Sequence, residues 1–196
     1  MSDARAASLH AEIAACTICA EHLPLGPRPV VQFSPQSRVL IIGQAPGTKV
    51  HASGTPWDDD SGDRLRDWLG LEKSVFYNSK KIALMPMGFC YPGKAKGGDA
   101  PPRKECAPQW HRRVLDTLPK DRLTLLVGAH AQAHYLPDTR KMTLTERVRS
   151  FREFAPIIPL PHPAWRVRMW IGKNPWFEED LLPMLKTRVQ SATETA

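Results

Sequence analysis

The residues of this sequence best suited to chemistry begin with its four cysteines. Cys16 and Cys19 form a C-x-x-C pair near the N-terminus, and Cys90 and Cys106 follow further along the chain. Four thiolates suit either a tetrahedral zinc ion or an iron–sulfur cluster. Such a site leaves no coordination position open, so we expect it to support folding rather than catalysis. The alternative is four unliganded cysteines that pack as small apolar residues.

A second group of residues could bind and attack a planar ligand. It begins with a glycine-bounded loop made of Gly43, Gln44, Ala45, Pro46 and Gly47. Downstream, Trp57 is followed directly by Asp58, Asp59 and Asp60. An indole can stack on a nucleobase while one carboxylate orients a water molecule. The alternatives are an ordinary turn for the glycines and a solvated acidic cluster at a helix start for the aspartates.

The third group surrounds His162, which lies between Pro161 and Pro163. Prolines on both sides stiffen the backbone, and an imidazole held in this way can donate to developing negative charge. The adjoining residues Trp165, Arg166 and Arg168 offer an aromatic wedge and phosphate contacts. The alternative is a surface loop with a structural histidine. The other six histidines lie in less constrained sequence, and we expect them in solvated, loop or helix-face positions.

Composition and charge narrow the class of protein. The chain has 196 residues, 42% of them hydrophobic, which predicts one globular domain spanning 1–196. Its net charge of +7 favours a polyanionic partner, although basic residues also serve solubility. No apolar run approaches the ~18 residues of a membrane span, and the N-terminus lacks a secretory pattern. We therefore expect a cytoplasmic protein, in which metal ligation is a more common fate for cysteine than a disulfide.

The elements that must position these residues alternate along the chain. Short apolar runs predict buried strands at 39–43, 82–85, 123–128 and 157–160. Helical spacing and caps predict helices at 3–20, 61–70, 106–118, 129–136, 144–151 and 174–189, with a flexible tail at 190–196. This alternation indicates a three-layer α/β/α fold with a mostly parallel four-stranded sheet. Ligands in such folds bind beyond the carboxyl ends of the strands, where the second and third groups begin.

Together these motifs resemble the uracil-DNA glycosylase superfamily over about residues 15–185, most closely its iron–sulfur families four and five. The resemblance is carried by the C-x-x-C pair, the G-x-x-P-G loop, the Gly-x-Pro-aromatic segment at 54–57, the distal cysteines with proline-rich sequence between them, and His-Pro-Ala at 162–164. It implies a DNA repair enzyme that flips a deaminated base out of DNA, hydrolyses the N-glycosidic bond and leaves an abasic site. It also implies that the cysteines hold a structural 4Fe-4S cluster, with zinc the less favoured occupant. We expect the enzyme to be a monomer.

The resemblance assigns roles to the candidate residues. The loop at 43–47 matches the family loop beside the base and its attacking water, with Gln44 where family four has glutamate. Ala45 replaces a catalytic acid or amide of other branches, so the activating carboxylate must come from elsewhere. Alignment on Ser-Gly-Asp at 61–63 points to Asp59, with Asp58 and Asp60 as competitors because the alignment needs a one-residue gap. Trp57 matches the ring that stacks on uracil, and His162 matches the histidine that stabilises the departing base anion.

One segment departs from the family pattern. Pro86 stands where the family usually has an asparagine that reads the edge of uracil. An apolar residue lacks the paired donor and acceptor of an amide, so backbone groups of Met87 or Gly88 are the expected substitutes. We therefore predict relaxed base choice that includes xanthine or hypoxanthine. The alternatives for the whole chain are a non-catalytic DNA-lesion or abasic-site binder, a metal-stapled redox protein and a zinc-stabilised structural module.

The resemblance also bears on the contacts with DNA. Pro163, Trp165, Arg166 and Arg168 are the expected DNA-binding residues, and either Trp165 or Arg166 would fill the space that the flipped base leaves in the stack.

Overall fold

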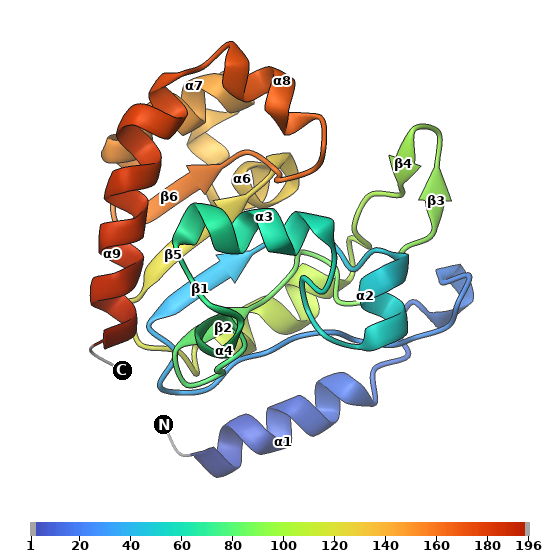
Figure 1. Cartoon of the computed structure of the whole chain (residues 1–196). Coiled ribbons are helices and arrows are strands. Elements are labelled where there is room, and N and C mark those ends of the chain that lie inside the picture. Colours follow the sequence, from blue (N-terminus) through green and yellow to red (C-terminus); the bar gives the residue numbers. More distant parts are fainter. Residues whose placement is uncertain (1–2, 195–196) are drawn as a thin grey trace.

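The computed structural model describes residues 3–194 and is built on a central four-stranded sheet (Figure 1). Its strands are β1 (Val39–Ile42), β2 (Ile82–Leu84), β5 (Leu123–Val127) and β6 (Ile157–Leu160). They lie in the order β2-β1-β5-β6 and pair in parallel throughout. This confirms the predicted sheet. The strand that contains Pro159 lies at an edge, where a missing backbone N–H is tolerated.

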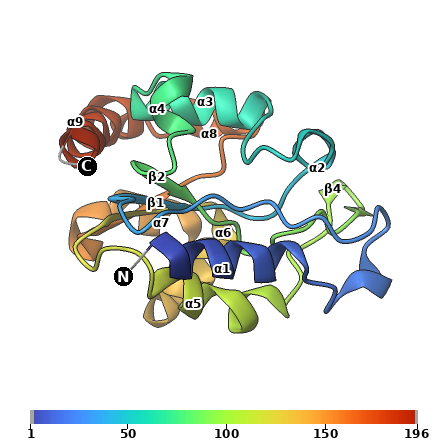
Figure 2. The same cartoon turned by 90° about the horizontal axis from the view of Figure 1, so that it is seen from below.

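Helices cover both faces of the sheet and complete three layers (Figure 2). One face carries α3 (Asp60–Leu69), α4 (Lys73–Phe76), α8 (Val167–Gly172) and α9 (Leu182–Glu194). The other carries α1 (Asp3–Ala14), α5 (Arg112–Leu115) and α6 (Ala129–Tyr135). Because strand side chains alternate, Val39 and Ile41 join the core under α3 and α9, and Leu40 and Ile42 join the core under α1. The fold is therefore the predicted α/β/α sandwich.

Shorter elements complete the chain. They are the 3₁₀ turns η1 (Ala20–His22), η3 (Pro137–Thr139) and η4 (Phe151–Phe154), the π-helical turns η2 (Ala107–His111) and η5 (Phe177–Leu181), and α7 (Leu144–Arg149). The predicted helices at 106–118 and 174–189 therefore each begin with a π-helical turn. Residues 190–194 of the predicted flexible tail form the last turn of α9, where Thr193 is buried. Residues 195–196 of that tail lie outside the described residues.

Helix α3 begins one residue before the predicted range of 61–70. The Asp59 side chain accepts a hydrogen bond from the backbone N–H of Gly62 at 2.8 Å, so Asp59 is the N-cap and the helix begins at Asp60. A carboxylate suits this position because it satisfies a free N–H and interacts favourably with the helix dipole. The cap therefore gives Asp59 a fixed place at the carboxyl end of the sheet.

Two elements that the sequence pattern did not predict surround the carboxyl ends of the strands. Helix α2 (Thr48–Ser53) follows the loop at 43–47 and ends at Gly54 in a left-handed conformation with φ of 73°. The strands β3 (Lys94–Ala95) and β4 (Gly98–Asp99) form a hairpin that protrudes from the body near α2 (Figure 1). Helix α8 was also unforeseen and follows the His162 segment. Within residues 3–194, no helix has the length and apolar character needed to cross a membrane.

Candidate active site

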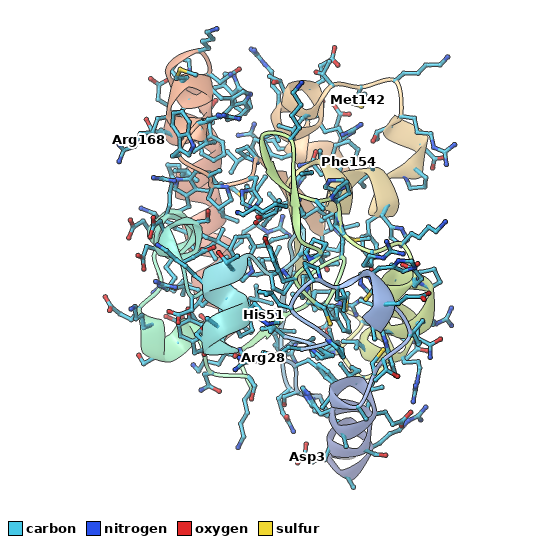
Figure 3. All side chains as sticks on the ribbon, turned by 90° about the vertical axis from the view of Figure 1, so that its right-hand side faces the viewer. Asp3, Arg28, His51, Met142, Phe154 and Arg168 are labelled. Atoms are coloured by element: carbon cyan, nitrogen blue, oxygen red, sulfur yellow. The ribbon has the colours of Figure 1, made fainter. Side chains whose placement is uncertain are left out.

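A pocket lies at the carboxyl ends of the strands. It is lined by residues 43–47 after β1, by Pro86 after β2 and by His162 after β6, with Trp57 and Asp59 from the segment before α3. Figure 3 views the molecule from this end, with His51 marking the position of α2. The structure therefore brings together the second and third groups of residues, as their places after the strands predicted.

The backbone of Trp57 is held in an unusual conformation. Its φ is 57°, in the left-handed region that a large L-residue seldom adopts. The carbonyl oxygen of Trp57 accepts a hydrogen bond from the Tyr77 hydroxyl at 3.2 Å, and that hydroxyl accepts one from Arg66 Nη1 at 3.0 Å. Arg66 is itself paired with Asp63. Such strain persists where surrounding contacts over-determine it, and here it directs the indole into the pocket.

Glycine at position 43 makes room for the Trp57 ring. A Cβ atom built at Gly43 would lie 2.6 Å from Cζ2 of the indole. This is closer than nonbonded carbon atoms approach, so a side chain at residue 43 would push the ring from its place. The first glycine of the loop therefore allows the backbone of β1 to approach the aromatic wall of the pocket.

The three consecutive aspartates differ in their surroundings. Asp59 is half-buried and lines the pocket, whereas Asp58 and Asp60 are exposed. Asp60 pairs with Lys49 Nζ at 2.9 Å, and the hydrogen bond from Lys49 lowers the pKa of the Asp60 carboxyl. The cap to Gly62 uses one hydrogen bond of the Asp59 carboxylate, which has capacity for several more. Of the three aspartates, Asp59 is therefore the one whose carboxylate lies at the pocket and keeps hydrogen-bonding capacity.

His162 faces Trp57 across the pocket. The two rings stack with centroids 5.8 Å apart and planes inclined by 30°. Arg64 Nη1 donates to the carbonyl of Pro163 at 2.5 Å and so ties the His162 segment to α3. Burial lowers the pKa of His162 below its ordinary value, against the opposing charge of Asp59. The imidazole is therefore neutral near pH 7 and carries one N–H that can donate.

The segment after β2 does not offer the backbone donors that the sequence suggested. The N–H of Met87 donates to the Gly43 carbonyl at 2.9 Å, and the N–H of Gly88 donates to the Gln44 carbonyl at 3.0 Å. These bonds continue the β1–β2 pairing beyond the ends of the strands, so both donors are used within the fold. The part of this segment that lines the pocket is Pro86. Of the backbone groups of Met87 and Gly88 that were expected to replace the missing amide, the two N–H groups are therefore not free to contact a base.

The rim beyond His162 is basic and exposes apolar side chains. Trp165 and Met169 are 68% and 67% exposed. The Arg166 guanidinium lies over the Trp165 ring, 5.1 Å from its centroid, and Arg168 points outward from α8 (Figure 3). Pro163, by contrast, is buried, and its carbonyl bonds to Arg64, so it positions the segment from within. Large exposed side chains beside arginines are suited to a surface that meets nucleic acid.

The four cysteines come from three separate parts of the chain and are all free thiols. Cys19, Cys90 and Cys106 are buried, and Cys16 is half-buried. Burial, and to a smaller extent charge on the other cysteines, raises the pKa of Cys90 to about 12 and that of Cys106 to about 11. The four thiols therefore lie within electrostatic range of one another. Across residues 3–194, no three His, Cys, Asp or Glu side chains are arranged as ligands of a metal ion.

One buried histidine lies behind the pocket wall and was grouped with the histidines expected in solvated, loop or helix-face positions. His111 is 3% exposed, with Nε2 placed 3.1 Å from the Pro86 carbonyl oxygen and Nδ1 placed 2.6 Å from the Tyr135 hydroxyl. Its spacing from Val114 and Leu118 matches the buried face of the predicted helix, a signal that was available. The hydrogen-bonding partners, about 25 residues away, were not visible in the sequence.

Comparison with known families agrees with this geometry. The family described as the uracil DNA glycosylase superfamily matches residues 30–186, a range that includes every residue lining the pocket. The match covers most of the chain, and Cys16 and Cys19 lie before its start. Members of this family act on DNA as glycosylases. The chain belongs to the uracil DNA glycosylase superfamily.

Proposed function

We propose that this protein is a monofunctional DNA glycosylase that excises uracil, and other deaminated bases, and leaves an abasic site. The observation that carries the proposal is one pocket that holds Trp57, Asp59 and His162 together at the carboxyl ends of the strands. Those three residues supply an aromatic surface, a carboxylate and a neutral hydrogen-bond donor. Hydrolysis of an N-glycosidic bond uses each of them.

The extruded base would lie against the Trp57 indole. Flipping a base costs a few kcal/mol and costs least for a mispaired base, which itself favours deaminated bases. Stacking on an aromatic side chain stabilises the flipped base by about 1–3 kcal/mol. The left-handed backbone and the Tyr77 bond fix the indole before DNA binds, so little ordering is needed at the moment of binding.

Bond cleavage separates charge, and the pocket places a suitable group at each end. Water held by Asp59 attacks C1′ of deoxyribose as the bond to the base breaks, and the carboxylate takes the proton from that water. The Gln44 side chain, on the same loop wall, is the second group placed to hold the water. The neutral His162 donates to the base oxygen on which negative charge develops. An oriented base contributes about 10²–10⁴-fold and a well-placed donor about 3 kcal/mol.

We propose that the pocket accepts more than one base. Pro86, which has neither a polar side chain nor a backbone N–H, lines the pocket where a base-reading amide would otherwise lie, and the neighbouring N–H groups are used by the fold. A wall without directional donors or acceptors rejects an alternative planar base only weakly. Xanthine and hypoxanthine are therefore the expected additional substrates, and the loop from Gly43 to Gly47 forms the remaining contact with the base.

DNA would be held by the rim beyond His162. Arg166 and Arg168 provide phosphate contacts, and Trp165 is exposed enough to enter the gap left by the flipped base. The net charge of +7 supports this partner. We propose that the protein acts as a monomer in the cytoplasm, since its thiols are free and suit a reducing compartment.

We also propose a 4Fe-4S cluster on Cys16, Cys19, Cys90 and Cys106. The donor set fits in kind, because four free thiols from three segments of the chain lie within electrostatic range of one another, and a bound cation would favour their thiolate forms. When bound, the cluster would link the end of α1 to the segments around β2 and η2. It would have no part in bond cleavage. Zinc is the alternative occupant.

The excision of bases from a panel of duplexes tests this function. Purified protein is incubated with duplexes that carry uracil, xanthine, hypoxanthine or an undamaged base, and abasic sites are revealed by strand cleavage in alkali. We expect cleavage at uracil and at one or more other deaminated bases, and loss of most turnover in His162→Ala. Binding to these duplexes with no cleavage at any of them would favour a non-catalytic lesion-binding protein, a function that the proline at position 86 also allows.

A further inference from the structure

His111 lies directly behind the wall of the pocket, and the proposed reaction does not use it. Its ring is buried between Phe89 and Tyr135, nearly parallel to both, with centroids 5.7 and 5.9 Å away. One nitrogen meets the Pro86 carbonyl at 3.1 Å, and the other meets the Tyr135 hydroxyl at 2.6 Å. A buried imidazole with both nitrogens engaged is fixed in position and in orientation.

These two partners determine which nitrogen carries the proton. The Pro86 carbonyl can only accept, so Nε2 must be the donor. Burial lowers the pKa of His111 to about 4, so the ring is neutral near pH 7 and holds a single N–H. Nδ1 is then an acceptor, and the Tyr135 hydroxyl donates to it. Burial also raises the pKa of Tyr135, which keeps that hydroxyl protonated.

The bond from His111 adds a third hydrogen bond to the two that hold the segment after β2. The Pro86 carbonyl accepts from His111, and the N–H groups of Met87 and Gly88 donate to the carbonyls of Gly43 and Gln44. The Pro86 carbonyl is bonded to His111, and Pro86, which has no backbone N–H, lines the pocket. The orientation of this one peptide therefore decides whether the base meets a polar group or an apolar wall.

We infer that His111 is a positioning residue that sets base selection: it holds the Pro86 peptide so that the pocket offers the base an apolar wall. On this side of the pocket, selection then depends on shape and stacking rather than on hydrogen bonds to the edge of the base. This inference rests on the proposed glycosylase function. Tyr135 supports it by fixing the His111 tautomer, so the complete positioning unit runs from Tyr135 through His111 to Pro86.

Nuclear magnetic resonance of the wild-type protein tests the geometry without reference to activity. Long-range ¹H–¹⁵N spectra of labelled protein at neutral pH distinguish the two tautomers of a histidine, and the spectrum of His111→Gln identifies the signal. We expect the neutral form with the proton on Nε2. A proton on Nδ1, or a charged ring, would overturn the inference whether or not the protein excises any base.

Single-turnover excision tests the effect on base selection. His111→Phe keeps a flat ring but removes the donor, so the excision rate should fall about tenfold, because a buried carbonyl loses its partner. The ratio of uracil to hypoxanthine excision should shift by about threefold or more. His111→Gln restores a donor, and its rate and ratio should lie within about threefold of wild type. His134→Ala is the matched control, since this exposed ring contacts His111 at its edge.

The outcomes separate positioning from a merely structural role. A folded His111→Phe with the wild-type rate and ratio would overturn the inference, as would a loss that His111→Gln fails to restore. If His111→Phe does not fold, two other measurements test the inference. They are the ratio of uracil to hypoxanthine excision in His111→Gln and the His111 tautomer in the wild type. If wild-type protein excises nothing from any duplex, the proposed function fails, and the tautomer still tests the His111–Pro86 bond.

Discussion

The carbonyl oxygen of Trp57 occupies the space in which a side chain at residue 62 would lie. A Cβ atom built at Gly62 would be 1.8 Å from that oxygen. In most helices, replacing glycine by alanine stabilises the helix by about 0.5–1 kcal/mol. Here the first turn of α3 and the strained backbone of Trp57 are packed so closely that only glycine fits.

Gly62→Ala should therefore destabilise the protein by about 1–3 kcal/mol, because overpacking must displace the Trp57 backbone. Thermal unfolding measures this change. Gly172→Ala is the matched control, since a Cβ atom at this glycine in α8 would enter open space. If Gly62→Ala and Gly172→Ala both unfold at the same temperature as the wild type, the proposed close packing of Gly62 against the Trp57 backbone is wrong.

The burial of His162 predicts a pH dependence of stability. Its pKa is lower in the folded than in the unfolded protein, so the unfolded state binds the proton first as the pH falls. Stability should therefore decline from about pH 6.5 downward, where an unfolded histidine becomes charged. His162→Asn should lose less stability than wild type between about pH 7 and about pH 5 in denaturant titrations. The exposed His130→Asn provides the control, and equal losses in all three proteins would contradict the prediction.

Arg168 should contribute affinity for DNA without contributing sequence preference. Arg168→Ala should weaken binding to any duplex by a similar factor, and it should reduce the slope of log K against log salt by about 0.9. Fluorescence anisotropy at several salt concentrations measures both. Arg112→Ala, on α5 across the sheet, should leave the slope unchanged. An effect of Arg168→Ala that is confined to one lesion would show that it reads the base instead.

If the four cysteines bind a metal centre, a variant that loses the metal should also lose thermal stability. Wild-type protein prepared without oxygen should contain about four iron and four sulfide per chain, and Cys90→Ser should lose both and unfold at a lower temperature. One zinc per chain would establish the other occupant. Wild-type protein that contains no metal and equals Cys90→Ser in stability would show that the four cysteines are unliganded core residues.

The sheet was predictable because its strands are continuous apolar runs, as buried parallel strands require. Val39–Ile42 is the clearest example, with all four side chains fully buried. Helix α8 was missed because it is short and its outer residues, such as Met169, are exposed, which breaks the helical pattern of apolar positions.

In the site, Trp57 and the aspartates stood out by their residue types, whereas the particular place of Asp59 depends on the cap to Gly62. Tyr77 and His111 were missed for a different reason. Each acts on the pocket through a backbone carbonyl of a distant residue, and such bonds leave no pattern in the sequence.

The comparison of Asp59→Asn with Asp58→Asn in single-turnover excision of uracil tests the central claim most directly. The two variants carry the same change in charge at neighbouring positions. Of these two aspartates, Asp59 lines the pocket and Asp58 does not. We expect Asp59→Asn to lose about 10²-fold or more in rate while its DNA affinity and folding remain intact, and Asp58→Asn to keep the wild-type rate. Full activity in Asp59→Asn, or an equal loss in both variants, would contradict the account.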